Sequence, residues 1–436
     1  MKKSLELYNK AKRIIPGGTQ LLSKRPEMFL PDFWPSYYSK SKGCLVWDLD
    51  SNKYIDMSYM GIGTNILGYA DDDVNKQVQK VINYGNCTTL NAPEEIELAE
   101  LLLELHSWAD MVRYARTGGE AMAIAVRIAR AKTRKELVLF CGYHGWHDWY
   151  LAANIKDINA LDDHLIPGLS PLGVPECLKG TAIPFRYNDI ESFNNLMKEY
   201  GNKVGAIIIE PIRNYYPDGD FLKTIRKAAD SNNIVFIIDE ITAGWRLHNG
   251  GAHMIFNIEP DIAVFGKGMS NGFPMAAIIG KEEVMQVVQD TFISSTYWTD
   301  RIGPTAAIAS IKKMIECKVP EHLISVGKEV QEGWENSGNK YDIELNISGI
   351  LPLGHFSFNY SNSQVIKTLF VQLMLERGFL ATTAYYASYA HKKEHVDSYL
   401  LAVEESFSII SDSIKKGNSD KYLKGSICHQ GFQRLT

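Results

Sequence analysis

The sequence predicts an α/β protein whose large domain is a mostly parallel sheet covered by helices. Short apolar runs rich in β-branched residues, such as Ile234–Ile238 and Ile262–Phe265, are typical of strands buried on both faces. These runs alternate with segments of helical character, which is typical of parallel sheets. Polar residues follow several runs directly, at the edge where such sheets bind ligands. A ligand site is therefore expected at that edge.

The elements of the large domain follow one another along the chain. Pro93, Glu94 and Glu95 favour a helix start, because proline suits the first turn and carboxylates suit the positive end of the helix dipole. The predicted helices are Asp72–Asn83, Pro93–His106, Glu120–Ala131 and Phe221–Ser231. The predicted strands are Met111–Ala115, Glu136–Phe140, Val204–Glu210, Ile234–Ile238 and Ile262–Phe265.

The two ends of the chain are predicted to form a smaller α+β domain. A helix over residues 1–15 should end at Pro16–Gly18, and Leu45–Asp48 and Lys53–Asp56 flank a turn typical of a hairpin. Past Pro304 a long helical stretch precedes short strands near Asp342–Ile347 and His355–Phe358. We expect an N-terminal segment at 1–62, the large domain at 63–303 and the C-terminal small domain at 304–436.

Composition limits the classes of function. The 436 residues are 45% hydrophobic and 22% charged, which is typical of a globular protein of about two domains. A net charge of −5 without a basic aromatic-rich patch argues against a nucleic-acid partner. No apolar run approaches the ~20 residues of a membrane span, and the start lacks the apolar part of a signal peptide. The six cysteines form no Cys-x-x-Cys pair, so we expect no metal site and reduced thiols in the cytoplasm.

Asp239 and Lys267 are the leading candidates for catalysis. They lie 28 positions apart, each just past a predicted central strand. A carboxylate and an amine at one sheet edge suit a Schiff-base lysine and an aspartate that keeps a heterocyclic cofactor protonated. A helix-capping aspartate and a surface lysine between Gly266 and Gly268 are the alternative.

Three further segments follow predicted strands. Thr117, Gly118 and Gly119 open a helix, where free N–H groups suit a phosphate, although a tight turn without a ligand is the alternative. The aromatic cluster at 143–149 could stack on a planar ring or pack in the core, and its two histidines lack a third metal ligand. Glu210 could be a solvated strand end, or could contact a cofactor hydroxyl or a charged neighbour.

In their order, these motifs resemble the class III aminotransferases, which have fold type I and use pyridoxal phosphate. The similarity is closest to the group of glutamate-1-semialdehyde aminomutase and runs from about Tyr8 to Val396. The matching motifs are Pro16–Gly18, Val46–Asp48, Tyr54–Asp56, Ile66–Gly68, Thr117–Ala121, Tyr143–Gly145, Glu210–Pro211, Asp239–Glu240, Gly244–Arg246, Gly250–Ala252, Pro260–Asp261 and Gly266–Lys267.

The resemblance implies roles for these residues. Lys267 would hold pyridoxal 5'-phosphate as a Schiff base and later carry a proton, and Asp239 would pair with the pyridine nitrogen. The other cofactor-binding residues would be Tyr143 stacked on the ring, His144 beside it, Glu210 near its face, Thr117, Gly118 and Gly119 on the phosphate, and Thr296 reaching the phosphate from the partner subunit. The enzyme would be a homodimer with active sites at the interface.

The chain also departs from the family. Gly119 replaces a residue with a hydroxyl group in the phosphate loop, and Ser270–Gly272 stands where three glycines are usual. Thr383–Ser388 replaces an acidic substrate contact, and Ser295–Arg301 is bulkier than usual, which favours a changed acceptor pocket. Arg301 could bind a carboxylate or phosphate there. Aromatic residues that could line the pocket, or pack in the core or the interface, are Trp34, Tyr37, Tyr59, Trp146, Tyr297 and Trp298.

The sequence therefore predicts an aminotransferase that moves an amino group from a donor to a carbonyl acceptor by a ping-pong mechanism. An intramolecular aminomutase is the alternative within the family. A non-catalytic homologue is the alternative outside it, and Lys267 and Asp239 argue against that. The identities of the small-molecule donor and acceptor are not specified by these residues.

Overall fold

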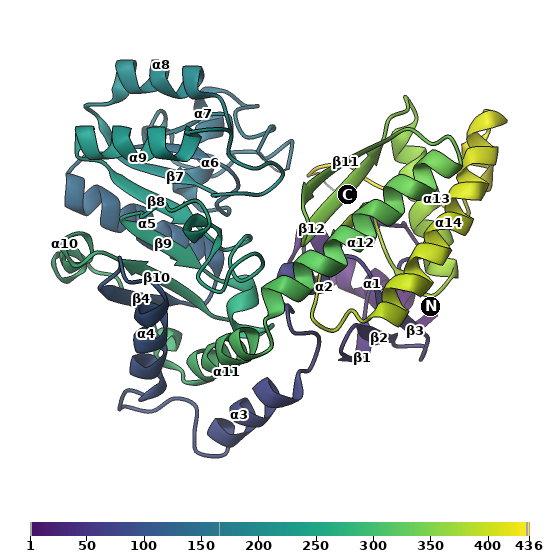
Figure 1. The fold of residues 1–436 in the computed structure, drawn as a ribbon, viewed down its shortest axis with the longest axis horizontal. Helices are drawn as coiled ribbons and strands as arrows, with labels where there is room; N and C mark the ends of the chain where they lie inside the picture. Colours follow the sequence, from purple (N-terminus) through teal and green to yellow (C-terminus); the bar gives the residue numbers. More distant parts are fainter. Residues whose placement is uncertain (1, 165, 433–434, 436) are drawn as a thin grey trace. The chain divides into compact units, whose positions relative to one another are not determined.

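The computed structural model describes residues 2–164, 166–432 and 435, which contacts divide into two compact units. One unit combines residues 1–71 with 321–436, and the other spans 72–320 (Figure 1). The sequence placed its divisions at 62/63 and 303/304. The domain boundaries expected from the sequence stay a prediction.

The second unit is built on a mostly parallel sheet, as the sequence predicted. Its strand order is β4-β10-β9-β8-β7-β5-β6 (Figure 1). The strands β5 to β9 run parallel, and β10 is antiparallel to both of its neighbours. The bounds are β4 Met111–Ala115, β5 Leu137–Cys141, β6 Ala182–Pro184, β7 Val204–Ile209, β8 Val235–Asp239, β9 Ile262–Phe265 and β10 Ala276–Gly280.

Both faces of this sheet are buried, which explains the continuous apolar runs. Successive side chains of a strand point to opposite faces, so Ala206 and Ile208 of β7 face one hydrophobic cluster and Ile207 and Ile209 face another. Helix α5 supplies much of the first cluster and α9 much of the second. The helices of this unit are α3 Asp72–Ile82, α4 Glu94–Leu105, α5 Gly118–Thr133, α6 Asp148–Leu151, α7 Ala153–Lys156, α8 Ile190–Tyr200, α9 Phe221–Asn232, α10 Glu282–Met285 and α11 Ile302–Glu316.

The first unit combines both ends of the chain around two small sheets. The expected hairpin is present as antiparallel β2 and β3, and its sheet has the order β1-β2-β3-β13. The other sheet has the order β11-β12-β14. The bounds are α1 Lys2–Ile14, β1 Tyr38–Lys42, β2 Leu45–Asp48, β3 Lys53–Asp56, α2 Met60–Gly63, α12 Val319–Lys340, β11 Leu345–Ile350, β12 Leu353–Phe358, α13 Ser363–Glu376, β13 Phe379–Leu380, β14 Ala384–Tyr386 and α14 Lys393–Lys415.

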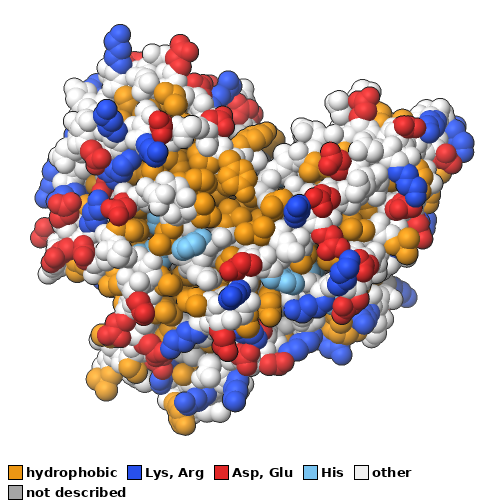
Figure 2. All heavy atoms as spheres, viewed as in Figure 1, with side chains coloured by type: hydrophobic (Ala, Val, Ile, Leu, Met, Phe, Trp, Pro, Cys, Tyr) orange, Lys and Arg blue, Asp and Glu red, His pale blue; other side chains and the backbone are white. Residues whose placement is uncertain are grey.

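The distribution of charged side chains on the surface is consistent with the low net charge of the chain. On the face drawn in Figure 2, acidic and basic side chains are interspersed rather than gathered by sign. Among the described residues, no helix combines the length and the apolar character that crossing a bilayer would need.

Candidate active site

Four candidate residues meet at the carboxyl edge of the parallel strands in the second unit. Tyr143 follows β5, Glu210 follows β7, Asp239 ends β8, and Lys267 lies two residues past β9. The strands β9, β8, β7 and β5 lie side by side in the sheet in that order. Their carboxyl ends therefore bring these side chains to one place. All of these contacts lie within one unit.

Lys267 has the surroundings of a reactive amine. It begins a 3₁₀ turn, Lys267–Ser270, and its φ of 43° is rare for a residue with a side chain. Its Nζ donates a hydrogen bond of 2.7 Å to Oγ1 of Thr242. Burial, with added repulsion from the cations of Arg213 and Arg246, lowers the pKa of Lys267 to about 8. Near pH 8, Lys267 therefore carries a neutral, nucleophilic amine in a substantial fraction of the protein molecules.

Asp239 is a buried carboxylate with two hydrogen bonds. It is 2% exposed, its Oδ2 lies 2.7 Å from Nδ1 of His144, and its Oδ1 accepts the N–H of Ile241 at 2.9 Å. Burial raises the pKa of Asp239, and the contact with His144 opposes that rise. A cationic pyridine nitrogen would be a suitable partner for such a carboxylate. The bond to the N–H of Ile241, two residues further on, is a local contact of the kind that the capping alternative expects, and the cofactor role of Asp239 stays a prediction.

His144 contacts Asp239 rather than standing free for a ring. Its Nδ1 faces the carboxylate, and its Nε2 lies 3.2 Å from the carbonyl oxygen of Cys141. With a proton on Nδ1, the imidazole donates to Asp239. The expected cofactor contact of His144 stays a prediction. The pair of His144 and Asp239 could not be predicted from the sequence, because the two residues are 95 positions apart.

Glu210 is buried and paired, so a solvated strand end is excluded. It is 3% exposed, and its Oε2 accepts the N–H of Tyr143 and a guanidinium N–H of Arg213, both at 3.0 Å. Burial raises the pKa of Glu210, but Arg213, His144 and the Tyr143 N–H outweigh it, so that the pKa lies below its ordinary value. Gly142 permits this approach, since a β-carbon there would lie 2.6 Å from Oε2 of Glu210.

The phosphate loop is the N-terminus of α5. Thr117 precedes the helix in an extended conformation, and its side chain makes no capping hydrogen bond. The first N–H groups of a helix have no acceptor within the helix, and in the described part of the chain Gly118 and Gly119 gain none elsewhere. A β-carbon on Gly118 would lie 2.9 Å from Ile241. The loop therefore offers free donors and a positive dipole end to an anion.

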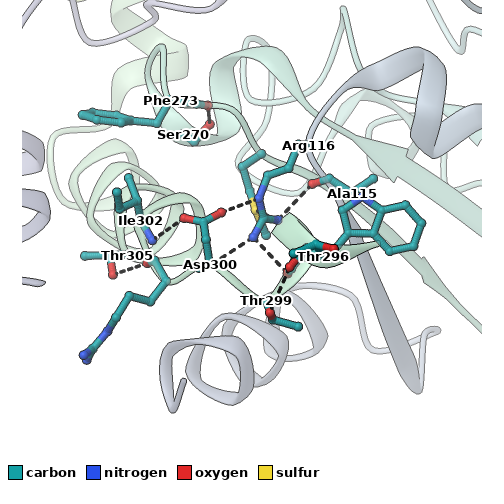
Figure 3. A network of polar contacts seen from close by, with 12 residues as sticks. Ala115, Arg116, Ser270, Phe273, Thr296, Thr299, Asp300, Ile302 and Thr305 are labelled. Carbon is teal, nitrogen blue, oxygen red and sulfur yellow. Dashed lines mark hydrogen bonds and ion pairs between the residues drawn. The ribbon is translucent and has the colours of Figure 1, made fainter. Parts of the chain in front are cut away.

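The segment that carries Thr296 is anchored beside this loop (Figure 3). Arg116 donates through Nε to Oδ2 of Asp300 at 2.7 Å and through Nη2 to the carbonyl oxygens of Trp298 and Asp300, both at 2.9 Å. Thr296 itself begins the 3₁₀ turn Thr296–Thr299 with an exposed side chain. Its contact with a partner's cofactor stays a prediction.

Several pocket candidates have structural partners. Arg301 forms an ion pair with Glu94 at 2.6 Å, so its guanidinium is engaged within the protein. Trp34 stacks on Phe29 with ring centroids 4.4 Å apart. Trp298 packs against a core cluster, whereas Tyr297 is 72% exposed.

Three polar neighbours of the site were missed by sequence reasoning. Thr242 and Arg213 follow recognised motifs closely and Arg246 ends one, but the sequence assigned them no role because their contacts depend on loop geometry. Among the described residues, no group of histidine, cysteine or acidic side chains is arranged to hold a metal ion.

The residues present fit the expected cofactor. The open N-terminus of α5 suits a phosphate, Asp239 suits a protonated ring nitrogen, and Lys267 suits a Schiff base. The partly buried ring of Tyr143 lies at the same edge.

Comparison with known proteins places the chain in a family. The family model described as aminotransferase class-III matches residues 32–400. The chain is 31% identical to the 3-aminobutyryl-CoA aminotransferase of Cloacimonas acidaminovorans, over 93% of this chain and 97% of the relative. It is also 31% identical to the glutamate-1-semialdehyde 2,1-aminomutase of Francisella philomiragia, over 93% and 98%.

Solved structures share the fold. The PLP internal aldimine form of the FumI protein from Sphingopyxis sp. MTA144 has a TM-score of 0.87 at 23% identity, covering 95% of this chain and 98% of that one. A glutamate-1-semialdehyde aminomutase from Pseudomonas aeruginosa PAO1 has a TM-score of 0.79 at 16% identity, covering 94% and 95%.

These matches extend over most of the chain and over nearly the full length of the relatives. They confirm the resemblance found in the sequence, the fold class, and the expectation of an enzyme whose cofactor is pyridoxal phosphate. The chain belongs to the class III aminotransferase family.

Proposed function

We propose that the protein is an aminotransferase that works by a ping-pong cycle, in which an amino donor leaves as a carbonyl compound before a carbonyl acceptor is aminated. The observation that carries the proposal is the pairing, on adjacent strand ends, of a lysine whose pKa is lowered to about 8 with the buried carboxylate of Asp239. When bound, pyridoxal phosphate supplies the electron sink that such amino transfer needs.

Each site residue has a proposed role that its surroundings support. Lys267 would hold the cofactor as a Schiff base and, when displaced, its Nζ would accept and return a proton, which its lowered pKa favours. Asp239 would keep a ring nitrogen protonated, with His144 orienting the carboxylate. Tyr143 would stack on the ring, and Thr117, Gly118 and Gly119 would bind the phosphate. Glu210 would hold Arg213 and the Tyr143 backbone in place.

The attachment point can be tested chemically. We expect borohydride reduction of the purified enzyme, followed by peptide mass spectrometry, to find the reduced cofactor on Lys267. The variant Lys267→Ala should lose both the yellow colour and the turnover, whereas Lys281→Ala, which removes a surface lysine paired with Asp261, should keep both. Turnover by Lys267→Ala, or a cofactor attached elsewhere, would refute the assignment.

The reaction can be tested with candidate amino donors. A true donor should bleach the absorbance near about 420 nm and release one carbonyl compound for each cofactor, without any acceptor present. A subsequent carbonyl acceptor should restore the absorbance. Each half-reaction is measured without the other substrate. The first therefore identifies the amino donor, and the second identifies the carbonyl acceptor.

An intramolecular aminomutase is the second candidate, because relatives 30–31% identical bear the name glutamate-1-semialdehyde 2,1-aminomutase. Such an enzyme starts from the aminated cofactor and releases no carbonyl compound. Incubation of that form with glutamate-1-semialdehyde distinguishes the two. Isomerisation of this substrate without a separate donor would favour the aminomutase and contradict the ping-pong proposal.

The working form is proposed to be a homodimer in the cytoplasm. Large apolar side chains lie exposed on the second unit, including Leu90 at 80%, Phe292 at 85% and Tyr297 at 72% exposure, and an interface would cover them. Thr296, in the same segment as Tyr297, would then reach the partner's phosphate. The six free cysteines suit a reducing compartment. Sedimentation analysis tests the dimer, since a monomer at working concentration would contradict it.

A further inference from the structure

Gly119 of the phosphate loop has no side chain, and the side chain of His147 packs against it. A β-carbon placed on Gly119 would lie 3.1 Å from Nδ1 and 3.2 Å from Cε1 of His147. Contacts this short are tighter than nearly all those of real β-carbons. The imidazole of His147 is therefore packed closely against the position where a side chain of residue 119 would begin.

The backbone around His147 is shaped for this contact. Gly145 has a φ of 103°, which favours glycine, and a β-carbon there would lie 2.9 Å from Cα of Gly119. The two glycine backbones thus touch, which brings the following residues over the N-terminus of α5. The ring of Trp146 stacks on the imidazole, with centroids 4.6 Å apart and planes 28° apart.

Nδ1 of His147 is a buried polar atom without a hydrogen-bond partner among the described residues. A buried polar atom without a partner has lost its hydrogen bond to water, so a ligand that pairs with it gains affinity. The atom lies close to Gly119, whose N–H group, like that of Gly118, is also without an acceptor among the described residues. Burial lowers the pKa of His147, and the carboxylates of Glu120 and Asp148 oppose this. A neutral imidazole with its proton on Nδ1 still donates a hydrogen bond.

We propose that His147 is a phosphate ligand of the cofactor in this protein, and that its Nδ1–H replaces the hydroxyl group that Gly119 lacks. This inference rests on the proposed function, because it takes the cofactor to be a phosphate monoester bound at the N-terminus of α5. It deepens that function by assigning a residue outside the loop to the phosphate. His147 contacts the cofactor's phosphate and not the reacting atoms, so its effect is on cofactor retention rather than on chemistry.

The experiment measures cofactor affinity rather than turnover. Protein freed of cofactor is titrated with pyridoxal phosphate and, separately, with pyridoxal, which lacks the phosphate. We expect His147→Ala to weaken the binding of pyridoxal phosphate by about 10- to 100-fold, the effect of one hydrogen bond to a charged group, and to leave the binding of pyridoxal unchanged. His147→Gln, which retains an N–H donor, should keep most of the affinity. Equal affinity of wild type and His147→Ala for pyridoxal phosphate would overturn the proposal.

A second pair of variants tests the exchange of donors directly. Gly119→Ser alone should weaken binding, because its β-carbon meets the imidazole at 3.1 Å and the ring must move. In the double variant Gly119→Ser with His147→Ala, the serine has room and supplies the missing hydroxyl, so the affinity should recover at least tenfold over His147→Ala. Additive losses in the double variant would contradict the exchange. If the wild-type protein itself takes up no pyridoxal phosphate, the proposed function fails; if it does and the variants match it, this inference alone fails.

Discussion

The guanidinium group of Arg116 holds Asp300 through its side chain and its backbone at once. Nε lies 2.7 Å from Oδ2 of Asp300, and Nη2 donates to the carbonyl oxygen of the same residue at 2.9 Å. Arg116 directly precedes the phosphate loop, whereas Asp300 ends the segment that carries Thr296 (Figure 3). The pair thus couples two stretches of chain that are both proposed to meet a cofactor phosphate.

Replacing Arg116 should uncouple these stretches. In Arg116→Lys the charge remains, but the compact ammonium group lacks the planar fork by which Nε and Nη2 of arginine reach Asp300 and Trp298 together. Because the ion pair is largely buried, with side chains 12% and 16% exposed, we expect a loss of roughly 2 kcal/mol in the free energy of unfolding. Denaturant unfolding measures it. Arg186→Lys is the matched control, since its ion pair with Asp163 is about 70% exposed and should contribute little.

Lys267 should make the stability of the cofactor-free protein depend on pH. Its pKa is about 8 in the folded protein, whereas an unfolded chain has the ordinary lysine pKa of 10.5. Between these two pH values the unfolded chain therefore binds more protons than the folded one. Stability should therefore rise as the pH increases from 8 to 10.5. Lys267→Met removes this cost, and we expect the variant to be more stable than wild type by roughly 3 kcal/mol at pH 7. The gain should vanish above pH 10.5.

Calorimetry at pH 7 and pH 10.5 tests this prediction. The variant Lys328→Met is a control, because Lys328 is 63% exposed and its replacement should bring no such gain. A gain for Lys267→Met that is the same at both pH values would mean that packing, not protonation, causes it.

His144 should act on catalysis through the protonation of Asp239. Burial raises the pKa of Asp239 and the contact with His144 opposes this, so His144→Phe should raise that pKa further. The acidic limb of the pH–rate profile should then move to higher pH, with roughly tenfold lower activity at neutral pH. His144→Gln can still donate an N–H and should keep the limb near its wild-type position. A uniform loss of rate without any shift would indicate a structural role instead.

Arg301 should not contribute to substrate binding. Because its guanidinium group is paired with Glu94, Arg301→Gln should leave KM unchanged and lower the thermal stability by roughly 1 kcal/mol. Steady-state kinetics with an identified substrate and thermal unfolding measure the two effects. A large rise in KM at unchanged stability would restore the earlier hypothesis of a substrate contact.

The strands and the motif residues were accessible from the sequence because their signals are local. β9 has the predicted bounds and β8 is displaced by one residue, since continuous apolar runs mark strands buried on both faces. β11 is displaced further, from Asp342–Ile347 to Leu345–Ile350, because its residues are only partly buried and alternate weakly. β10 was not predicted, as only Ile278 and Ile279 in Ala276–Gly280 favour a strand, and two alanines and a glycine flank them.

The second layer of the site was not accessible, because it depends on long-range contacts. His144 meets Asp239 across 95 positions, and Arg116 meets Asp300 across 184. No pattern of spacing or charge pairs such residues in a single sequence. The substitution at Gly119 was visible in the sequence, but the imidazole that fills its place was not, since that depends on the contact between two glycine backbones.

The antiparallel strand β10 has a consequence for the synthesis of the protein. In the sheet of the second unit, β4 lies at one edge and is hydrogen-bonded to β10. β10 ends at Gly280, whereas the phosphate loop begins at Thr117, two residues after the end of β4. A nascent chain therefore makes the phosphate loop early but cannot fix its place in the sheet until some 160 further residues have left the ribosome. The cofactor site can form only after that point.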